Sequence, residues 1–448
     1  MKRKATSQLR LQPAGGKAAA VPVGRKVQLH IERMAHDGRG IAYLEGRTWF
    51  VSGALPGEQV QAQVLGGRQK LVDARMLAVL TPSAQRREPA CPHTERCGGC
   101  NLQHWPEAQQ LAFKQQSLAD QLKRVAQLEP EHWAAPLAGE PLAYRRRARV
   151  AVRWNAQRQQ LDVGFRAEAS QEVVALNDCA VLVQPLQKIL HALPATLNAL
   201  EAPQSVGHVE LFYGDASAVL VRHTKPLSES DQQALQRWAD SHAAQLWLQG
   251  KGEPEASVAG QVLSYSLPSW QVQLGYRPGD FVQVNAALNE RMVAQALDWL
   301  GDVQGLRVLD LFSGLGNFSL PLARCGAEVT AVEGVAGMVA RAQHNAEANG
   351  LKVRCVQADL FAPLAGNWLA DGCDIVLLDP PRDGAQQVAK QIKELGAARV
   401  LYVSCNPATL ARDAALLAEQ GYRLVKAGLL DMFPQTAHAE AMALFAQY

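Results

Sequence analysis

A cysteine at the end of an apolar segment is the first candidate for chemistry in this chain of 448 residues. Cys405 follows Tyr402-Val403-Ser404 and precedes the polar pair Asn406-Pro407, and a second polar run, Asp379-Pro380-Pro381-Arg382, also follows an apolar segment. Ligands of open α/β sheets bind outside the carboxyl ends of the strands, so both runs would face one crevice. A thiol displayed there could act as a nucleophile. The alternative is a buried core thiol, because free cysteine is among the most buried residue types.

Glycines and acidic residues follow the other apolar segments of the same region. The loop from Asp310 to Phe318 contains Gly314 and Gly316, which would let a ligand approach the backbone at a helix N-terminus. Glu333, Asp359 and Asp379 end the next three segments. Acids at strand ends can hold ribose hydroxyls and amino groups, and the lack of a complete Gly-x-Gly-x-x-Gly motif favours S-adenosylmethionine over a dinucleotide. Ordinary turn glycines and loop acids are the alternative.

Four further cysteines form a second candidate site. Cys91, Cys97 and Cys100 lie within ten residues, with glycines between them, and Cys179 is the fourth. In a reducing compartment, clustered thiols indicate a metal site before they indicate disulfides. Zinc and an iron–sulfur cluster both take four thiolates, and the spacing does not choose between them.

The C-terminal candidates require a sheet that brings them together. Compact apolar segments alternate with helical stretches in this part of the chain, at residues 306–309, 329–332, 353–356, 375–378 and 400–403. Such alternation is typical of a parallel sheet covered by helices on both faces. We therefore predict an α/β fold with a Rossmann-like domain over residues 281–448.

The chain before this domain is predicted to be rich in strands. Residues 24–80 contain alternating segments at 27–31, 47–51 and 58–64 that are separated by glycines, which predicts a small β-barrel.

A central domain is predicted over residues 81–280. It begins with a Pro-, Cys- and Arg-rich junction and an amphipathic helix at about 108–128. Antiparallel strands follow, for example 147–154 paired with 161–165 across a turn at Asn155.

The distribution of charge indicates a polyanionic partner, although the net charge is only +3. Residues 1–30 contain seven basic residues and no acidic one, and Arg145-Arg146-Arg147-Ala148-Arg149 forms a second cluster. Such local excess suits a nucleic acid. We expect residues 1–23 to be a disordered tail, and solvated charge without a partner is the alternative for both clusters.

Nothing in the sequence suggests a membrane. No segment approaches the roughly 18 to 20 consecutive apolar residues of a spanning helix, and the basic start is not followed by an apolar signal core. We expect a cytoplasmic protein with no membrane partner and no obligate protein partner.

Five C-terminal motifs together resemble the RNA uracil-carbon-5 methyltransferase family. The cysteine set and the amino-terminal barrel make the resemblance closest to members that act on 23S ribosomal RNA, which carry a TRAM barrel, a 4Fe-4S cluster and a Rossmann-like methyltransferase domain in this order. The motifs are Gly279-Asp-Phe-Val-Gln-Val-Asn285, Gly314/Gly316/Asn317, Asp379-Pro-Pro-Arg382, Ser404-Cys-Asn-Pro407 and His438-Ala-Glu440.

The resemblance implies methyl transfer from S-adenosylmethionine to carbon 5 of a uridine in 23S ribosomal RNA. Cys405 would add to carbon 6 of the flipped-out base and Glu440 would remove the carbon 5 proton. Phe281 would stack on the base, or it would be a core aromatic residue. The implied cofactor contacts are Gln283, Phe312, Asn317, Glu333, Asp359 and Asp379, and the implied 4Fe-4S ligands are Cys91, Cys97, Cys100 and Cys179.

Three other functions fit part of the sequence. The same reaction on another RNA, such as transfer RNA, is the nearest alternative. A cytosine carbon-5 methyltransferase is less well supported, because its thiol lies in a different local motif. A non-catalytic iron–sulfur RNA-binding factor for ribosome assembly would need neither Cys405 nor Glu440.

Overall fold

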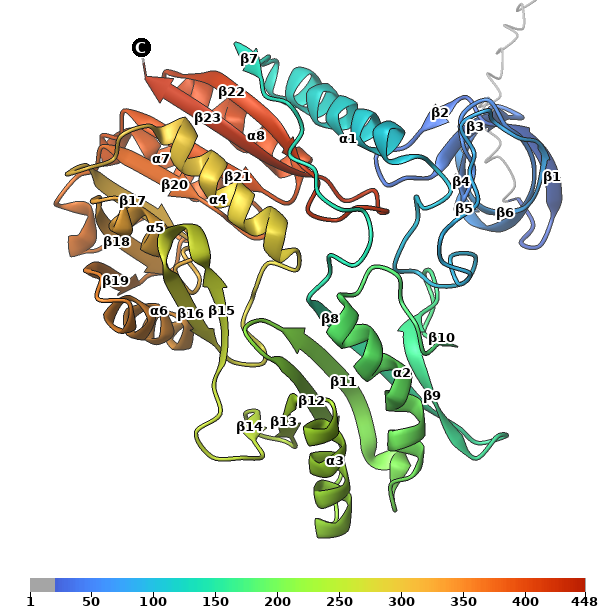
Figure 1. Ribbon diagram of the computed structural model, residues 1–448. Coiled ribbons are helices and arrows are strands. Elements are labelled where there is room, and N and C mark those ends of the chain that lie inside the picture. The colour runs from blue at the N-terminus through green and yellow to red at the C-terminus, as the bar shows by residue number, and fades with distance from the viewer. Residues whose placement is uncertain (1–20, 448) are drawn as a thin grey trace, which may run out of the picture. The chain divides into compact units, whose positions relative to one another are not determined.

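The computed structural model describes residues 21–447, and its chain divides into two compact units, Met1–Arg86 and Arg87–Tyr448 (Figure 1). The basic tail predicted for residues 1–23 lies outside the described residues, except for its last three. Among the described residues, no helix combines the length and apolar character needed to cross a bilayer.

The first unit is a strongly curved sheet of six strands, in the order β1-β5-β6-β4-β3-β2. Alternate residues face its interior, and Trp49, Val51 and Val60 are fully buried there. The predicted barrel is confirmed, and its predicted strands differ from the observed ones only at their ends. The strands are β1 (Lys26–His30), β2 (Arg33–Met34), β3 (Gly40–Leu44), β4 (Arg47–Ser52), β5 (Gln59–Arg68) and β6 (Leu71–Thr81).

The second unit contains a seven-stranded middle sheet, in the order β10-β9-β8-β11-β12-β13-β14. The predicted hairpin is confirmed, because β8 and β9 pair antiparallel with Trp154 opposite Leu161. The strands are β8 (Arg147–Asn155), β9 (Gln160–Arg166), β10 (Val173–Ala175), β11 (Val206–Tyr213), β12 (Ser217–His223), β13 (Ala244–Gln249) and β14 (Glu255–Ala256).

Two helices modify the antiparallel fold predicted for this region. Helix α2 (Gln184–Asn198) packs its buried leucines on one face of the sheet. Helix α3 (Glu229–Ser241) connects β12 to β13, which are parallel. The antiparallel prediction is therefore wrong for this pair, because a helical crossover is the connection that parallel strands require. A separate hairpin of β15 (Leu263–Leu267) and β16 (Val272–Tyr276) leads into the last domain.

The C-terminal sheet has eight strands, in the order β19-β18-β17-β20-β21-β23-β22-β7. The five predicted parallel strands are confirmed, while β23 runs antiparallel to both β21 and β22. The strands are β7 (His132–Trp133), β17 (Arg307–Leu311), β18 (Glu328–Glu333), β19 (Val353–Gln357), β20 (Ile375–Leu378), β21 (Arg399–Ser404), β22 (Tyr422–Leu430) and β23 (Glu440–Gln447).

Helices cover both faces of this sheet, so residues that point to either face of a central strand are buried. Leu378 and Tyr402 face a core formed with α1 (Glu107–Gln121), its π-helical extension (Leu122–Ala126), α7 (Gln386–Gln391) and α8 (Pro407–Glu419). Leu377 and Val403 face the opposite core, formed with α4 (Ala286–Leu300), α5 (Ser319–Arg324) and α6 (Ala336–Ala348). Helix α1 precedes the middle sheet in the sequence, yet it lies beside α8 and β22 (Figure 1).

Candidate active site

Strand register places Cys405 and Glu440 opposite each other at one end of the sheet. In the antiparallel pair of β21 and β23, Ser404 is the partner of Ala441. Continuing that register by one residue sets Cys405 against Glu440, the first residue of β23. The two side chains proposed for covalent chemistry therefore come from adjacent strands, although 35 positions separate them in the sequence.

The local sequence around Cys405 explains why the strand stops there. Asn406 caps α8, because its side chain accepts a hydrogen bond from the Ala408 backbone N–H, and Pro407 is the first helical residue. The Asn406 side chain also donates to the Arg382 carbonyl at 3.0 Å. The capping residue thus joins the loop after β20 to the loop after β21.

The Cys405 thiol is half-buried, and both acidic and basic side chains lie near it. Burial, followed by the carboxylates of Glu440 and Asp379, raises its pKa to about 11, while Arg382 acts in the lowering direction. Few such thiols are ionised at neutral pH. Among the groups that act on this thiol, Arg382 is the side chain that favours its thiolate form.

The Glu440 carboxyl is buried and only partly satisfied. Its Oε2 atom has no hydrogen-bond partner among the described residues. Burial and the neighbouring Asp379 raise its pKa to about 8, and Lys114 acts in the lowering direction. A carboxyl with its pKa near neutrality is suited to accept a proton.

The glycine loop after β17 contains several residues in the left-handed backbone region. Gly314 and Gly316 have φ values of 58° and 94°, and Phe312 also has a positive φ of 62°. A Cβ at Gly316 would lie 2.3 Å from Leu320 Cδ1, so only glycine fits there. The loop leads into α5, as the sequence predicted.

Two of the predicted strand-end acids hold backbone groups around this loop. Glu333 accepts hydrogen bonds from the N–H groups of Gly314, at 3.2 Å, and Val335, at 2.9 Å. Asp359 is exposed and accepts from the Phe361 N–H at 2.9 Å. The acids therefore hold these backbone groups in place, while their remaining oxygen lone pairs stay available to a ligand.

Asp379 follows β20 directly. Burial, with a contribution from Asp310, raises its pKa to about 7. Through the pairing of Leu378 with Leu311 and Tyr402, Asp379 lies between the glycine loop and Cys405. Of the three strand-end acids, it is the one that the sheet brings next to both the predicted cofactor crevice and the predicted nucleophile.

Asn317 and Gln283, two further predicted cofactor residues, differ in whether their side-chain amides already have hydrogen-bond partners. Both amide groups of Asn317 are engaged, since its Oδ1 and Nδ2 pair with Asn289 at 2.9 Å and Tyr265 donates to Oδ1 at 3.1 Å. The buried Gln283 Oε1, in contrast, has no partner among the described residues. A ligand donor would satisfy that oxygen.

Three residues of this region were missed by the sequence analysis. Asp310 is buried at the end of β17, where burial raises its pKa to about 7. The ring of Phe361 packs edge-on against Phe312 at 5.6 Å, although it is half exposed. Lys114 lies on α1. The position of Asp310 in the glycine motif could have identified it, whereas Lys114 has no local signal.

Phe281 is 62% exposed, which rules out the core aromatic that was one of its two interpretations. Its proposed stacking on the base stays a prediction.

The four predicted metal-site cysteines line one cavity of about 970 Å³. All eight cysteines of the chain are free thiols. Burial, with a contribution from Cys100 and Cys91, raises the pKa of Cys179 to about 12. Within residues 21–447, however, no three His, Cys, Asp or Glu side chains converge as ligands of a single metal ion.

The same cavity is lined by several basic side chains. Arg145, Arg149 and Arg153 of the middle region line it, together with Arg382 and His438. The cysteine set and Arg382, which acts on the Cys405 thiol, thus line one basic hollow within the second unit.

Comparison with known proteins identifies two matching families. The tRNA (uracil-5-)-methyltransferase family matches residues 106–447, and the TRAM domain matches residues 20–77. The 23S rRNA (uracil(1939)-C(5))-methyltransferase RlmD of Pseudomonas fluorescens is 61% identical over 440 residues, which cover 98% of each chain. The RlmD of Pseudomonas putida is 60% identical over 447 residues, which cover 99% of each chain.

A solved structure shares the fold. The tRNA (uracil-54, C5)-methyltransferase of Pyrococcus abyssi, crystallised with S-adenosyl-L-homocysteine, superimposes with a TM-score of 0.71 over 94% of this chain and 100% of that chain. The identity is 21%, so this similarity concerns the fold alone.

Proposed function

Because the chain belongs to the tRNA (uracil-5-)-methyltransferase family, we propose that it transfers a methyl group from S-adenosylmethionine to carbon 5 of a uridine in 23S ribosomal RNA. The observation that carries the chemistry is that the adjacent strands β21 and β23 bring Cys405 and Glu440 to the same end of the sheet. The choice of 23S ribosomal RNA rests on relatives of about 60% identity over nearly the whole chain.

The site residues fit a covalent route to methylation. Carbon 5 of uracil is a weak nucleophile, so the ring must first gain electrons. The Cys405 thiolate bonds to carbon 6, and the resulting enolate can take a methyl group at carbon 5. Glu440 then accepts the carbon 5 proton, the electrons of that C–H bond re-form the ring double bond, and the bond between sulfur and carbon 6 breaks.

The crevice beside Cys405 suits the adenosyl cofactor. Buried oxygens without partners among the described residues, Gln283 Oε1 and Asp310 Oδ1, could accept hydrogen bonds from it. We propose that the predicted set of Gln283, Phe312, Asn317, Glu333, Asp359 and Asp379 surrounds it, with Asn317 acting through its backbone because its amide is engaged. When bound, S-adenosylmethionine supplies an electrophilic methyl group.

For the second site we propose a 4Fe-4S cluster on Cys91, Cys97, Cys100 and Cys179. The four thiols surround one cavity, which supports a ligand set of this kind. Each thiolate of such a cluster binds a different iron, so the four sulfurs surround a body and need not converge on one point. Methyl transfer needs no oxidant or reductant, so the proposed role of the cluster is to stabilise the fold.

The substrate assignment can be tested by mapping. Ribosomal and transfer RNA from cells with and without this protein would be analysed for 5-methyluridine. We expect one position of 23S ribosomal RNA to lose the modification, and expression of the wild-type chain to restore it. Loss from transfer RNA with unchanged ribosomal RNA would identify the alternative substrate.

The arginines of the basic cavity are expected to bind RNA phosphates. Arg153→Gln should weaken binding and reduce the slope of log K against log salt by about 1, because each neutralised phosphate releases counterions. Arg158→Gln is the matched control, since Arg158 lies in the same hairpin but forms an ion pair with Asp162. Titration of labelled RNA at several salt concentrations measures both slopes. Equal slopes for wild type and Arg153→Gln would exclude this contact.

A further inference from the structure

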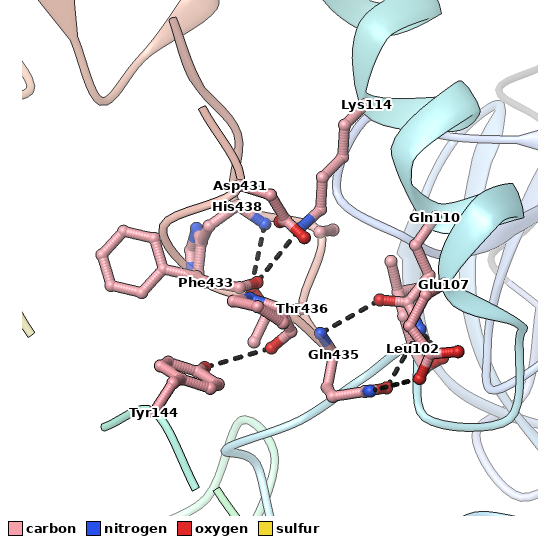
Figure 2. Close-up of polar contacts among 12 residues, drawn as sticks. Leu102, Glu107, Gln110, Lys114, Tyr144, Asp431, Phe433, Gln435, Thr436 and His438 are labelled. Carbon is pink, nitrogen blue, oxygen red and sulfur yellow. Dashed lines mark hydrogen bonds and ion pairs between the residues drawn. The ribbon is translucent and has the colours of Figure 1, made fainter. Parts of the chain in front are cut away.

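The connection between β22 and β23, residues 431–439, ends at Glu440 and is held by buried side chains of α1 (Figure 2). Gln110 accepts a hydrogen bond from the Gln435 N–H at 3.0 Å and donates to the Gln435 side-chain oxygen at 3.0 Å. Tyr144 donates to the Pro434 carbonyl at 3.1 Å. Gln435 itself has a φ of 67°, so the connection adopts a backbone conformation that these contacts must maintain.

Lys114 lies one turn after Gln110 on the same helix and is fully buried. Its ammonium group donates to Asp431 Oδ1 at 2.6 Å and to the Phe433 carbonyl at 3.0 Å (Figure 2). A lysine is almost never buried this completely unless it is paired. The ion pair therefore fixes the start of the connection, just as Gln110 fixes its middle.

The same ammonium group also acts electrostatically on the Glu440 carboxyl, and each group favours the charged form of the other. The other charged or titratable neighbours of Glu440 are Asp379 after β20 and Cys405 after β21. Asp379 opposes a negative charge on Glu440, whereas the Cys405 thiol, with its pKa raised to about 11, is uncharged at neutral pH. Lys114 is thus the buried cation of this group, since Arg382 is exposed and the pKa of His438 is lowered, which favours its neutral form.

We propose that Lys114 is a positioning residue for proton removal: it holds the connection that leads into Glu440 and supplies a buried positive charge in the surroundings of that carboxylate. This inference rests on the proposed function and assigns a role within its last step. It concerns release of the product, because Glu440 acts only after the methyl group has been transferred.

The test separates formation of the covalent adduct from its release. Lys114→Gln removes the charge but keeps an amide that can donate to Asp431 and the Phe433 carbonyl. Without the Lys114 charge the pKa of Glu440 should rise, which leaves less carboxylate at neutral pH. In a plot of release rate against pH, the fall in rate on the acidic side (the acidic limb) should therefore shift to higher pH by about one unit. At pH 7 release should slow about 10-fold, and the RNA–protein adduct on denaturing gels should increase. Trapping by RNA containing 5-fluorouridine should keep its wild-type rate, because it requires no proton removal.

Gln110→Leu is the matched control, because it loosens the same connection without changing charge. It should lower release at every pH and leave the position of the limb unchanged. If Lys114→Gln does not fold, Lys114→Gln/Asp431→Asn leaves no unpaired buried charge and should shift the limb in the same direction. The proposal would be overturned by a folded Lys114 variant whose release rate has the wild-type pH dependence and whose adduct level equals that of the wild-type protein. Failure of the proposed function gives a different result, since the wild-type protein would then form no fluorouridine adduct.

Discussion

Cys405→Ala is expected to abolish methylation while leaving binding of S-adenosylmethionine near its wild-type strength. The thiol is the atom that would activate the ring, and without it carbon 5 does not attack the methyl group. The substitution removes one half-buried sulfur atom at a strand end, outside the fully buried layers of the sheet. Radiolabelled methyl transfer to RNA measures the first effect, and calorimetric titration with the cofactor measures the second.

Glu440→Gln is expected to stop the reaction at its last step, the release of the methylated RNA. Attack and methyl transfer remain possible, but release stalls, so a methylated RNA–protein adduct should accumulate and survive denaturation. Loss of the carboxylate charge also removes one of the groups that raise the pKa of Cys405, so the adduct should form at lower pH than in the wild-type protein. The sign follows because a lower thiol pKa gives more thiolate at any pH below it.

Both substitutions would be compared on one denaturing gel, with methyl-labelled S-adenosylmethionine and unlabelled RNA. The expected pattern is no shifted band for Cys405→Ala, a strong band for Glu440→Gln, and a band for the wild-type protein only with 5-fluorouridine RNA. Full turnover by Cys405→Ala would show that the thiol is not the nucleophile. A Glu440→Gln variant that turns over normally would assign the proton to another base.

The parallel strands could be predicted from the sequence because each is a short apolar run that carries its own signal. Residues 375–378, for example, form β20 within the predicted limits. The glycine loop and the strand-end acids could be found for the same reason, since their chemistry is local. The antiparallel strands β22 and β23 were not predicted, although the pairing of β23 with β21 brings Glu440 beside Cys405.

Lys114 could not have been assigned to the active site from the sequence. It lies on a helix that precedes the middle sheet, and its partner Asp431 comes more than 300 positions later. Helix periodicity identifies a buried face, but it does not say which layer covers that face. The same applies to Tyr144 and Gln110, whose contacts with the connection are equally distant in sequence.

Replacement of Cys97 is expected to have the largest effect on stability. Protein purified without oxygen should contain iron and acid-labile sulfide, and Cys97→Ser should lose both and unfold at lower urea concentration. Because metal binding contributes folding free energy, the loss should amount to several kcal/mol. Cys355→Ser is the matched control, since Cys355 is also half-buried but belongs to β19. Stoichiometric zinc without iron in the wild-type protein would contradict the cluster assignment.

The structure also predicts which part of the second unit loosens first in Cys97→Ser. The Gln103 side chain forms a hydrogen bond with the thiol of Cys100 and accepts a hydrogen bond from the Cys91 N–H at 3.0 Å. The adjacent Leu102 donates its N–H to the Gln435 carbonyl at 3.0 Å, and Asn101 accepts from the Ala437 N–H at 2.9 Å. Loss of the cluster should therefore increase hydrogen exchange in residues 431–439 as well as around the cysteines, while the parallel strands stay protected. Exchange that rises only around the cysteines would show that the cluster does not support the connection to Glu440.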